Sequence, residues 1–193
     1  VEFMEAHPEA GGVGVHMLNA NGTFAPESRR GLPTPFVAFC KMSGLAKRFP
    51  KSRLFGRYYM SYLDKREVNE IEVMSGAYMM LRREALDKVG MLDEDFFMYG
   101  EDIDLSYRVL KGGYKNYFLP VRMLHYKGES TAKNSYRYAY TFYQAMRLFF
   151  RKHFGHYSLI ISLPINAATW ASTFTVYLRN RMRYGRCPRM AEL

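Results

Sequence analysis

The sequence predicts an α/β domain that is followed by basic amphipathic helices. Short apolar runs alternate with helical patterns through residues 1–132, and that alternation is typical of α/β folds. Charge divides the chain at the same place: residues 1–132 hold 18 basic and 17 acidic groups, whereas residues 133–193 hold 10 basic groups and one acidic group. With 48% hydrophobic residues, a chain of 193 residues can bury a core. We therefore expect two parts, residues 1–132 and residues 133–193.

The expected elements follow from glycine, proline and polar punctuation. A first helix ends at His7, and a strand over 13–17 leads into a polar turn at 19–22. A helix over 35–48 and an aromatic loop over 54–63 precede a strand that begins at Glu70. The later elements are expected to be apolar runs at 71–74 and 78–81, a short helix ended by Gly90, a helix over 101–111, a strand at 121–124 and an aromatic, basic helix over 134–153.

Acidic residues are concentrated in one segment. Six of the 18 lie within the fifteen positions from Gly90 to Asp104, interleaved with four aromatic or apolar residues at 96–99. Because a carboxylate beside apolar surface can have a shifted pKa, this segment is a candidate active site. The other interpretation is an acidic helix N-terminus without a function of its own.

The helical pattern of residues 101–111 separates the acids of this segment. At 3.6 residues per turn, Asp102 shares a face with Leu105 and is expected to point inward. Asp104 and Arg108 share another face, where we expect an ordinary, solvent-facing i,i+4 ion pair.

Four motifs occur in the order of a known family. They are Ser-Gly-Ala at 75–77, Gly-x-x-Asp-Glu-x-Phe-Phe at 90–97, Tyr-x-Glu-Asp-x-Asp-Leu at 99–105 and His-x-x-Gly-x-Ser at 125–130. The chain resembles family 2 glycosyltransferases with the GT-A fold, especially the bacterial rhamnosyltransferase-like members. Segments 12–15, 21–22 and 29–30 fit that family too, so the resemblance covers roughly residues 1 to 131. It implies the C-terminal part of a GT-A (Rossmann-like) domain.

The resemblance implies roles for Glu101 and Asp102. In this family the aspartate of the Glu-Asp pair is generally the base that deprotonates the acceptor hydroxyl for inverting sugar transfer. That points to Asp102, with Glu101 orienting the acceptor. A sugar hydroxyl is a poor nucleophile, so a positioned carboxylate is worth on the order of 100- to 10,000-fold in rate.

Two loops are expected to bind substrate. Gly76 and Ala77 are small enough for a ligand to approach the backbone, and the resemblance implies that their loop lines the donor-sugar and acceptor pocket. A tight turn that merely needs small residues is the other interpretation. Lys127 and Ser130 are of the kinds that hold a diphosphate. In many relatives the residue that matches His125 helps to bind the divalent metal.

The implied metal is Mn²⁺ or Mg²⁺, and its Asp-x-Asp ligands are expected upstream of Val1. Neither Asp-x-Asp string in this chain, at 93–95 or 102–104, follows a strand. On a helix, carboxylates at i and i+2 diverge by about 200 degrees and cannot readily clamp one ion. We therefore interpret the chain as part of a longer enzyme that is inactive as this fragment alone.

The basic tail predicts association with an anionic membrane surface. Residues 158–178 carry no charge and as a helix would be about 30 Å long, but Pro164 and a polar stripe favour an amphipathic helix over one that spans the membrane. Both forms stay open. No nucleic-acid motif accompanies the tail, so we expect no nucleic-acid partner. The expected location is the cytoplasmic face of the bacterial inner membrane.

The function predicted is that of an inverting glycosyltransferase. It would move a sugar from a nucleotide sugar to a lipid-linked or polysaccharide acceptor in cell-surface glycan synthesis. The alternative is a non-catalytic, membrane-bound sugar- or partner-binding module that keeps the fold. A metal-dependent hydrolase has less support, because the sequence holds no second cluster of His or Asp ligands.

Overall fold

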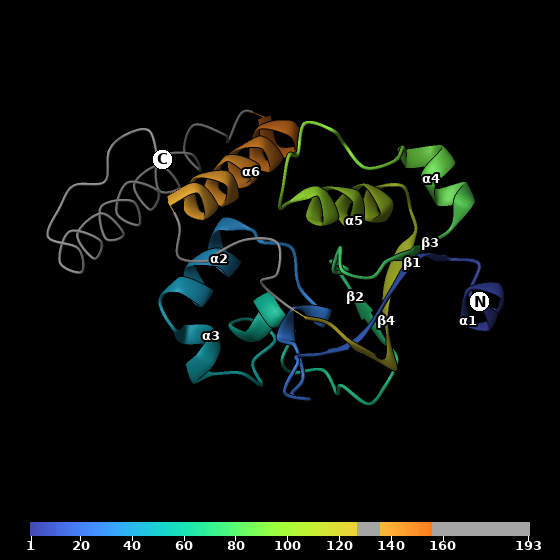
Figure 1. The fold of residues 1–193 in the computed structure, drawn as a ribbon, viewed down its shortest axis with the longest axis horizontal. Helices are drawn as coiled ribbons and strands as arrows, with labels where there is room; N and C mark the ends of the chain where they lie inside the picture. Colours follow the sequence, from blue (N-terminus) through green and yellow to red (C-terminus); the bar gives the residue numbers. More distant parts are fainter. Residues whose placement is uncertain (127–135, 156–193) are drawn as a thin grey trace, which may run out of the picture. The chain divides into compact units, whose positions relative to one another are not determined.

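A computed structural model describes residues 1–126 and 136–155, and its mixed α/β architecture confirms the expected fold class (Figure 1). The chain forms two compact units. The first holds residues 1–93 together with helix α5 (Glu101–Lys111) and strand β4 (Lys115–Leu124). The second, in its described part, holds residues 94–100 and helix α6 (Tyr136–Phe154). The division expected at residue 132 stays a prediction.

Four strands of the first unit form one mixed sheet in the order β2-β4-β1-β3. The central strand β1 (Ala10–Leu18) runs parallel to β4, and Leu18 pairs with Leu124 at their carboxyl ends. The short strands β2 (Asn69–Ile71) and β3 (Met80–Leu81) add antiparallel edges. Both central strands are longer than predicted. The polar start of β4, Lys115-Asn-Tyr, hid its first half from pattern analysis.

Apolar side chains cover both faces of the sheet. Val13 clusters with Met4 of helix α1 (Glu2–Ala6), whereas Met74 and Phe118 belong to a separate cluster with Ile71. Glycine in β1 permits the close approach of Met74, because a Cβ at Gly12 would lie 2.4 Å from the Met74 methyl carbon. The sequence of β1 therefore favours tight packing against the segment that follows β2.

The prediction of one continuous helix over residues 35–48 is wrong. This segment is divided into α2 (Pro35–Met42) and α3 (Leu45–Arg48), because Gly44 has a φ of +81° that no right-handed helix allows. The aromatic loop contains a short 3₁₀ helix, η2 (Gly56–Tyr59). A second one, η1 (Pro26–Ser28), lies upstream. As predicted, helix α4 (Arg83–Val89) ends at Gly90.

The second unit joins the aromatic segment before α5 to α6. The Tyr99 and Phe142 rings lie 6.4 Å apart, and the Lys152 ammonium lies 5.8 Å from the centre of the Phe96 ring. Phe96 is buried, but Phe97 is 78% exposed, so the apolar residues at 96–99 are not all buried.

Across residues 1–126 and 136–155, no helix has both the length and the apolar character that crossing a membrane requires. The uncharged run at 158–178 lies outside the described residues.

Candidate active site

Asp102 lies in the first turn of α5 and points inward, as its helical face predicts. Its side chain is 13% exposed. The Arg30 guanidinium and the Gly76 N–H, at 3.1 Å, both donate to Oδ2. No hydrogen bond from residues 1–126 or 136–155 reaches Oδ1. One oxygen of this carboxylate is therefore held in place, and the other has no protein partner in the described parts of the chain.

Buried polar contacts fix α5 against the segment that carries Gly76. The Met74 N–H donates to the Ser106 hydroxyl at 3.1 Å. The fully buried Asn116 amide donates to the carbonyls of Glu72 and Ser106, each at 3.0 Å. These hydrogen bonds join residues 72–76 to α5 and β4. They therefore hold Gly76 beside Asp102 as part of the folded core.

Arg30 is held by the same segment. Its carbonyl accepts from the Val73 N–H at 2.9 Å, and its guanidinium donates to the Met74 carbonyl at 3.0 Å. Burial lowers the pKa of Arg30, but the charge and hydrogen bond of Asp102, together with the nearby Tyr58 and Glu27, more than offset this, so the net shift of the pKa is upward. Arg30 is therefore a permanent cation. Tyr58 interacts electrostatically with both members of the pair, and burial raises the pKa of its hydroxyl.

Glu101 lies beside this pair and has a different electrostatic character. Burial raises the pKa of its carboxyl, and the charge of Asp102 adds to the effect. Its Oε2 is buried and makes no hydrogen bond to the described residues. A Cβ built on Gly76 would lie 3.4 Å from the Asp102 Cβ and 3.6 Å from the Glu101 Oε1. The structure thus brings together three predicted site residues: Gly76, Glu101 and Asp102.

Ala77 and His125 are two further predicted site residues, and neither of these two described residues forms a hydrogen bond or ion pair with Asp102. Ala77 is exposed in the same turn as Gly76, which the Tyr78 N–H closes by donating to the Ser75 carbonyl at 3.0 Å. His125 follows β4, and its N–H donates to the Leu18 carbonyl at 2.8 Å, so it lies at the carboxyl edge of the parallel strand pair. Lys127 and Ser130 lie outside the described residues.

The expectation of a solvent-facing Asp104 is wrong. Its side chain is fully buried, although the predicted ion pair with Arg108 is present at 2.7 Å. Arg108 also donates to the carbonyls of Val89, Gly90 and Met91, at 2.6, 3.0 and 2.7 Å. The end of α4 therefore covers this second face of α5. The helical pattern alone did not indicate a second neighbour for α5.

The described residues do not by themselves provide a metal site. Among residues 1–126 and 136–155, no three His, Cys, Asp or Glu side chains are placed to hold an ion together. Asp102 and Asp104 pair with different arginines, Arg30 and Arg108.

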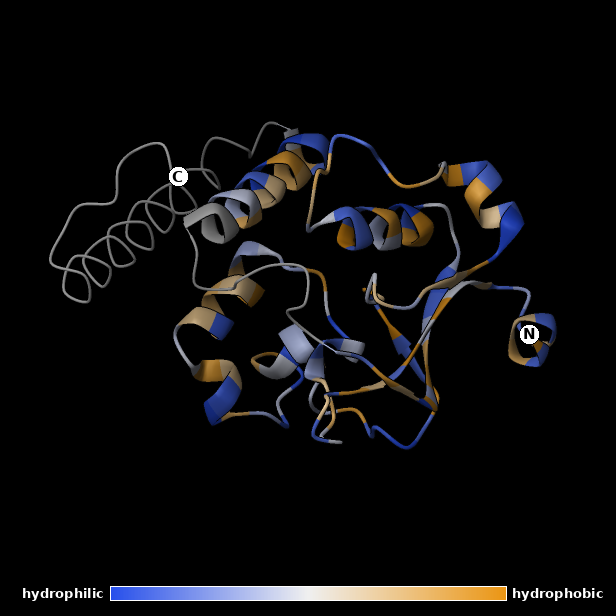
Figure 2. Ribbon diagram, in the orientation of Figure 1, coloured by the Kyte–Doolittle hydropathy of each residue, from blue (hydrophilic) through white to orange (hydrophobic). Residues whose placement is uncertain are grey.

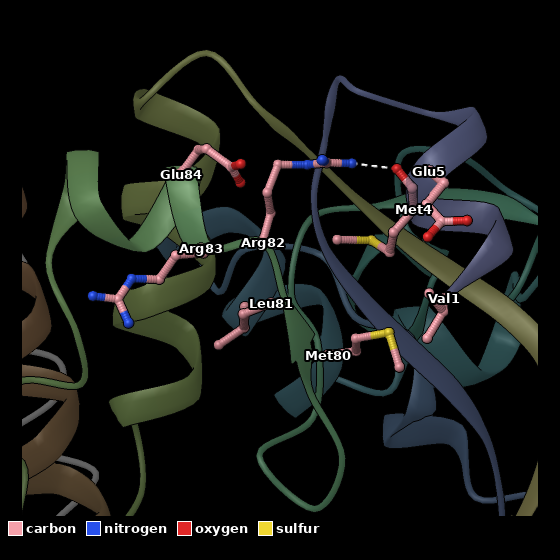
Figure 3. Close-up of a pocket in the computed structure, with 8 residues that line it drawn as sticks. All are labelled: Val1, Met4, Glu5, Met80, Leu81, Arg82, Arg83 and Glu84. Carbon is pink, nitrogen blue, oxygen red and sulfur yellow. Dashed lines mark hydrogen bonds between the residues drawn. The ribbon is translucent and has the colours of Figure 1, made fainter.

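A surface hollow lies elsewhere on the first unit (Figure 3). Its volume is about 210 Å³, and it is closed on one side by Arg82, which donates to the Met4 carbonyl. The lining contains none of the predicted site residues; it consists of Val1, Met4, Glu5 and residues 80–84. The hollow is therefore separate from the site around Asp102.

Comparison with known proteins defines the class. The model of "Glycosyl transferase family group 2" matches residues 20–186. The chain therefore belongs to family 2 of the glycosyltransferases, and its mixed sheet is consistent with a GT-A type domain. No solved structure matches the chain.

Two curated relatives are rhamnosyltransferases. The chain is 30% identical over 128 residues to the N-acetylglucosaminyl-diphospho-decaprenol L-rhamnosyltransferases of Mycobacterium tuberculosis strains CDC 1551 / Oshkosh and ATCC 25618 / H37Rv. The match includes 66% of this chain and 41% of each relative. The chain thus spans about two fifths of the length of these relatives, and the rhamnosyltransferase-like resemblance is confirmed.

Proposed function

We propose that this chain is the acceptor-side part of an inverting glycosyltransferase. The observation that supports the proposal best is the Asp102 carboxylate, with Oδ2 held by Arg30 and Gly76 and with no described partner on Oδ1. A general base must be fixed in position and must still offer an oxygen to the proton that it removes. Asp102 meets both requirements.

The reaction needs one displacement. The acceptor hydroxyl donates a hydrogen bond to Oδ1 of Asp102. Its proton passes to that oxygen while the hydroxyl oxygen forms a bond to the anomeric carbon of the donor. The bond between that carbon and the nucleotide diphosphate breaks, and its electron pair leaves with the diphosphate. Because the acceptor oxygen attacks the face of the anomeric carbon opposite to the leaving diphosphate, the anomeric configuration inverts. Glu101, whose raised pKa favours the protonated form, is proposed to orient the acceptor.

The relatives support a choice of substrates. By similarity to the two rhamnosyltransferases, we propose a nucleotide sugar as donor, with L-rhamnose as the first sugar to test. The proposed acceptor is lipid-linked, such as a polyprenyl-diphosphate glycan, or a polysaccharide in cell-surface glycan synthesis. The proposed location is the cytoplasmic face of the bacterial inner membrane, and the basic residues of 133–193 support a peripheral association.

A divalent metal is part of the proposal. When bound, Mn²⁺ or Mg²⁺ would neutralise charge on the leaving diphosphate. The described residues do not form such a site, and only His125 is proposed as a contributor to it. Lys127 and Ser130 are proposed to hold the diphosphate. We propose that residues 1–193 alone lack metal-dependent transferase activity.

The decisive experiment offers the full-length protein a panel of nucleotide sugars with Mn²⁺ or Mg²⁺ and identifies the products by mass spectrometry. Transfer from one donor, with inverted anomeric configuration in the product, supports the proposal. Binding of glycan without transfer from any donor would favour a non-catalytic binding module instead.

A further inference from the structure

The helices α2 and α3 and the loop that follows them form a surface with an unusual charge balance. We call residues 35–54 the α2–α3 surface. It contains five Lys or Arg residues and no Asp or Glu, and the acid-free stretch extends from Glu27 to Asp64. Residues 1–132 as a whole are nearly neutral, so this part of the first unit is locally basic.

Large apolar side chains are exposed on the same surface. Phe36, Phe39 and Met42 are 46%, 58% and 71% exposed. They recur every third residue and so share one face of α2, while Val37 and Cys40 occupy the buried face. Exposed apolar residues continue beyond α2 with Phe49 and Leu54, which are 46% and 56% exposed. In Figure 2 the ribbons of α2 and α3 carry both hydrophobic and hydrophilic segments.

The three helical pieces are fixed to one another. Helices α2, α3 and η2 are in mutual contact. The Lys41 ammonium lies 3.6 Å from the centre of the Tyr58 ring, and the Arg48 guanidinium lies 5.7 Å from the centre of the Phe49 ring. Cations and apolar rings are thus interleaved on a formed surface.

We propose that the α2–α3 surface docks on a membrane that contains anionic phospholipid. Phe, Met and Leu side chains would enter the boundary between headgroups and acyl chains, and the Lys and Arg side chains would contact lipid phosphates. Charge complementarity favours this partner. The α2–α3 surface carries five Lys or Arg side chains and no Asp or Glu, so it attracts an anionic surface and repels a basic one. The exposed Met42 and Leu54 favour lipid over nucleic acid, whose phosphates and bases offer them little apolar surface.

The α2–α3 surface adjoins the candidate active site. The Gly31 N–H, next in sequence to Arg30, lies 3.2 Å from the carbonyls of Arg57 and Tyr58 in η2. Tyr58 in turn lies under Lys41 of α2 and interacts electrostatically with Arg30 and Asp102. A docked membrane would therefore present a lipid-linked acceptor close to Asp102; this last step rests on the proposed function, whereas the docking itself does not.

The experiment measures co-sedimentation of the full-length protein with vesicles of phosphatidylcholine alone or mixed with phosphatidylglycerol. One variant removes cations, K47A/R48A/K51A, and another removes apolar groups, F39S/M42S. Each has a matched control with residues that are also exposed but lie elsewhere in the first unit, R83A/K88A/K111A and M91S/L92S. Thermal melts of all four verify that these surface changes leave the fold intact.

We expect the cation variant to bind mixed vesicles about 100-fold more weakly, since each Lys or Arg near an anionic surface is worth about fivefold. The apolar variant should bind at least about tenfold more weakly. Both controls should bind like the wild type. Unchanged binding of both variants, equal binding to pure phosphatidylcholine, or losses as large in the controls would overturn the proposal. Competition by single-stranded DNA that depends on Phe39 and Met42 would also overturn it, in favour of a nucleic-acid surface.

A transfer assay separates this proposal from the proposed function. The two variants should retain wild-type turnover with a water-soluble acceptor and lose it only when the acceptor is embedded in vesicles. Absence of transfer by the wild type would reject the proposed function alone, because vesicle binding is measured without donor or acceptor.

Discussion

The guanidinium of Arg30 donates to the carboxylate of Asp102, a residue 72 positions further along the chain. Both side chains are largely buried, with exposed fractions of 14% and 13%. The same guanidinium donates to the Met74 carbonyl, two residues before Gly76. Arg30 thereby ties the turn that contains Gly76 to the first turn of α5, and it fixes which oxygen of Asp102 faces away from the protein groups that hold it.

The first prediction concerns Asp102. In the full-length enzyme, Asp102→Asn should lower turnover at least roughly 100-fold, because an amide cannot take the proton of the acceptor hydroxyl. Steady-state kinetics at saturating donor measure this, and calorimetry should show donor binding close to that of the wild type. Turnover within a few-fold of the wild type would reject Asp102 as the base.

Asp87→Asn is the matched control for that substitution. Asp87 forms an i,i+4 ion pair with Arg83, as Asp104 does with Arg108, but its side chain is 60% exposed. An exposed pair of this kind contributes at most about 1 kcal/mol, so turnover and stability should hardly change. Asp104→Asn is unsuitable as a control because Asp104 is buried.

The second prediction concerns the pairing of Arg30 with Asp102. Arg30→Met should lower the free energy of unfolding by about 3 kcal/mol or more, because it leaves a largely buried carboxylate without its cation. In the double variant R30M/D102N the uncompensated charge is gone, so the loss should be smaller than the sum of the two single losses by about 1 to 3 kcal/mol. Urea denaturation of the four proteins completes this cycle, and additive losses would mean that the two side chains are not coupled.

The third prediction concerns the second arginine–carboxylate pair of the site region. Asp104→Asn should lower the free energy of unfolding by about 3 kcal/mol, because Arg108 stays largely buried among the carbonyls that end α4. The midpoint of urea denaturation checks this against Asp87→Asn. A midpoint equal to that of the control would show that water reaches Arg108 after the substitution.

Much of this arrangement could be predicted from local sequence. The bounds of α5 follow from its acids, its bases and the glycines on either side, and the inward direction of Asp102 follows from helical periodicity. The turn at Gly76 and the end of α4 at Gly90 were likewise indicated by small or flexible residues.

The remaining features depend on contacts between distant segments. No local pattern in the sequence marks Arg30 as the partner of Asp102, and the burial of Asp104 depends on where the end of α4 folds back. The break at Gly44 had a local signal, because glycine commonly adopts the positive φ that ends a right-handed helix. The position of Tyr58 beside Arg30 and Asp102 could not be predicted either, because the sequence of an aromatic loop does not indicate which ring faces inward.

The last prediction is a pH dependence due to Glu101. Burial raises the pKa of this carboxyl above its ordinary value of 4.5, so the folded protein holds the proton more tightly than the unfolded chain does. Between 4.5 and the folded pKa, stability must therefore fall as the pH rises, and the loss persists at higher pH. Glu101→Gln removes the ionisable group, so it should raise the melting temperature relative to the wild type near neutral pH, and this advantage should disappear at a pH below 4.5. Thermal melts of both proteins across that range provide the measurement, with Glu84→Gln on the exposed side of α4 as the control. A melting temperature for Glu101→Gln that is below the wild type near neutral pH would mean that the ionised carboxylate is stabilised in the folded protein, and that Glu101 does not favour its protonated form.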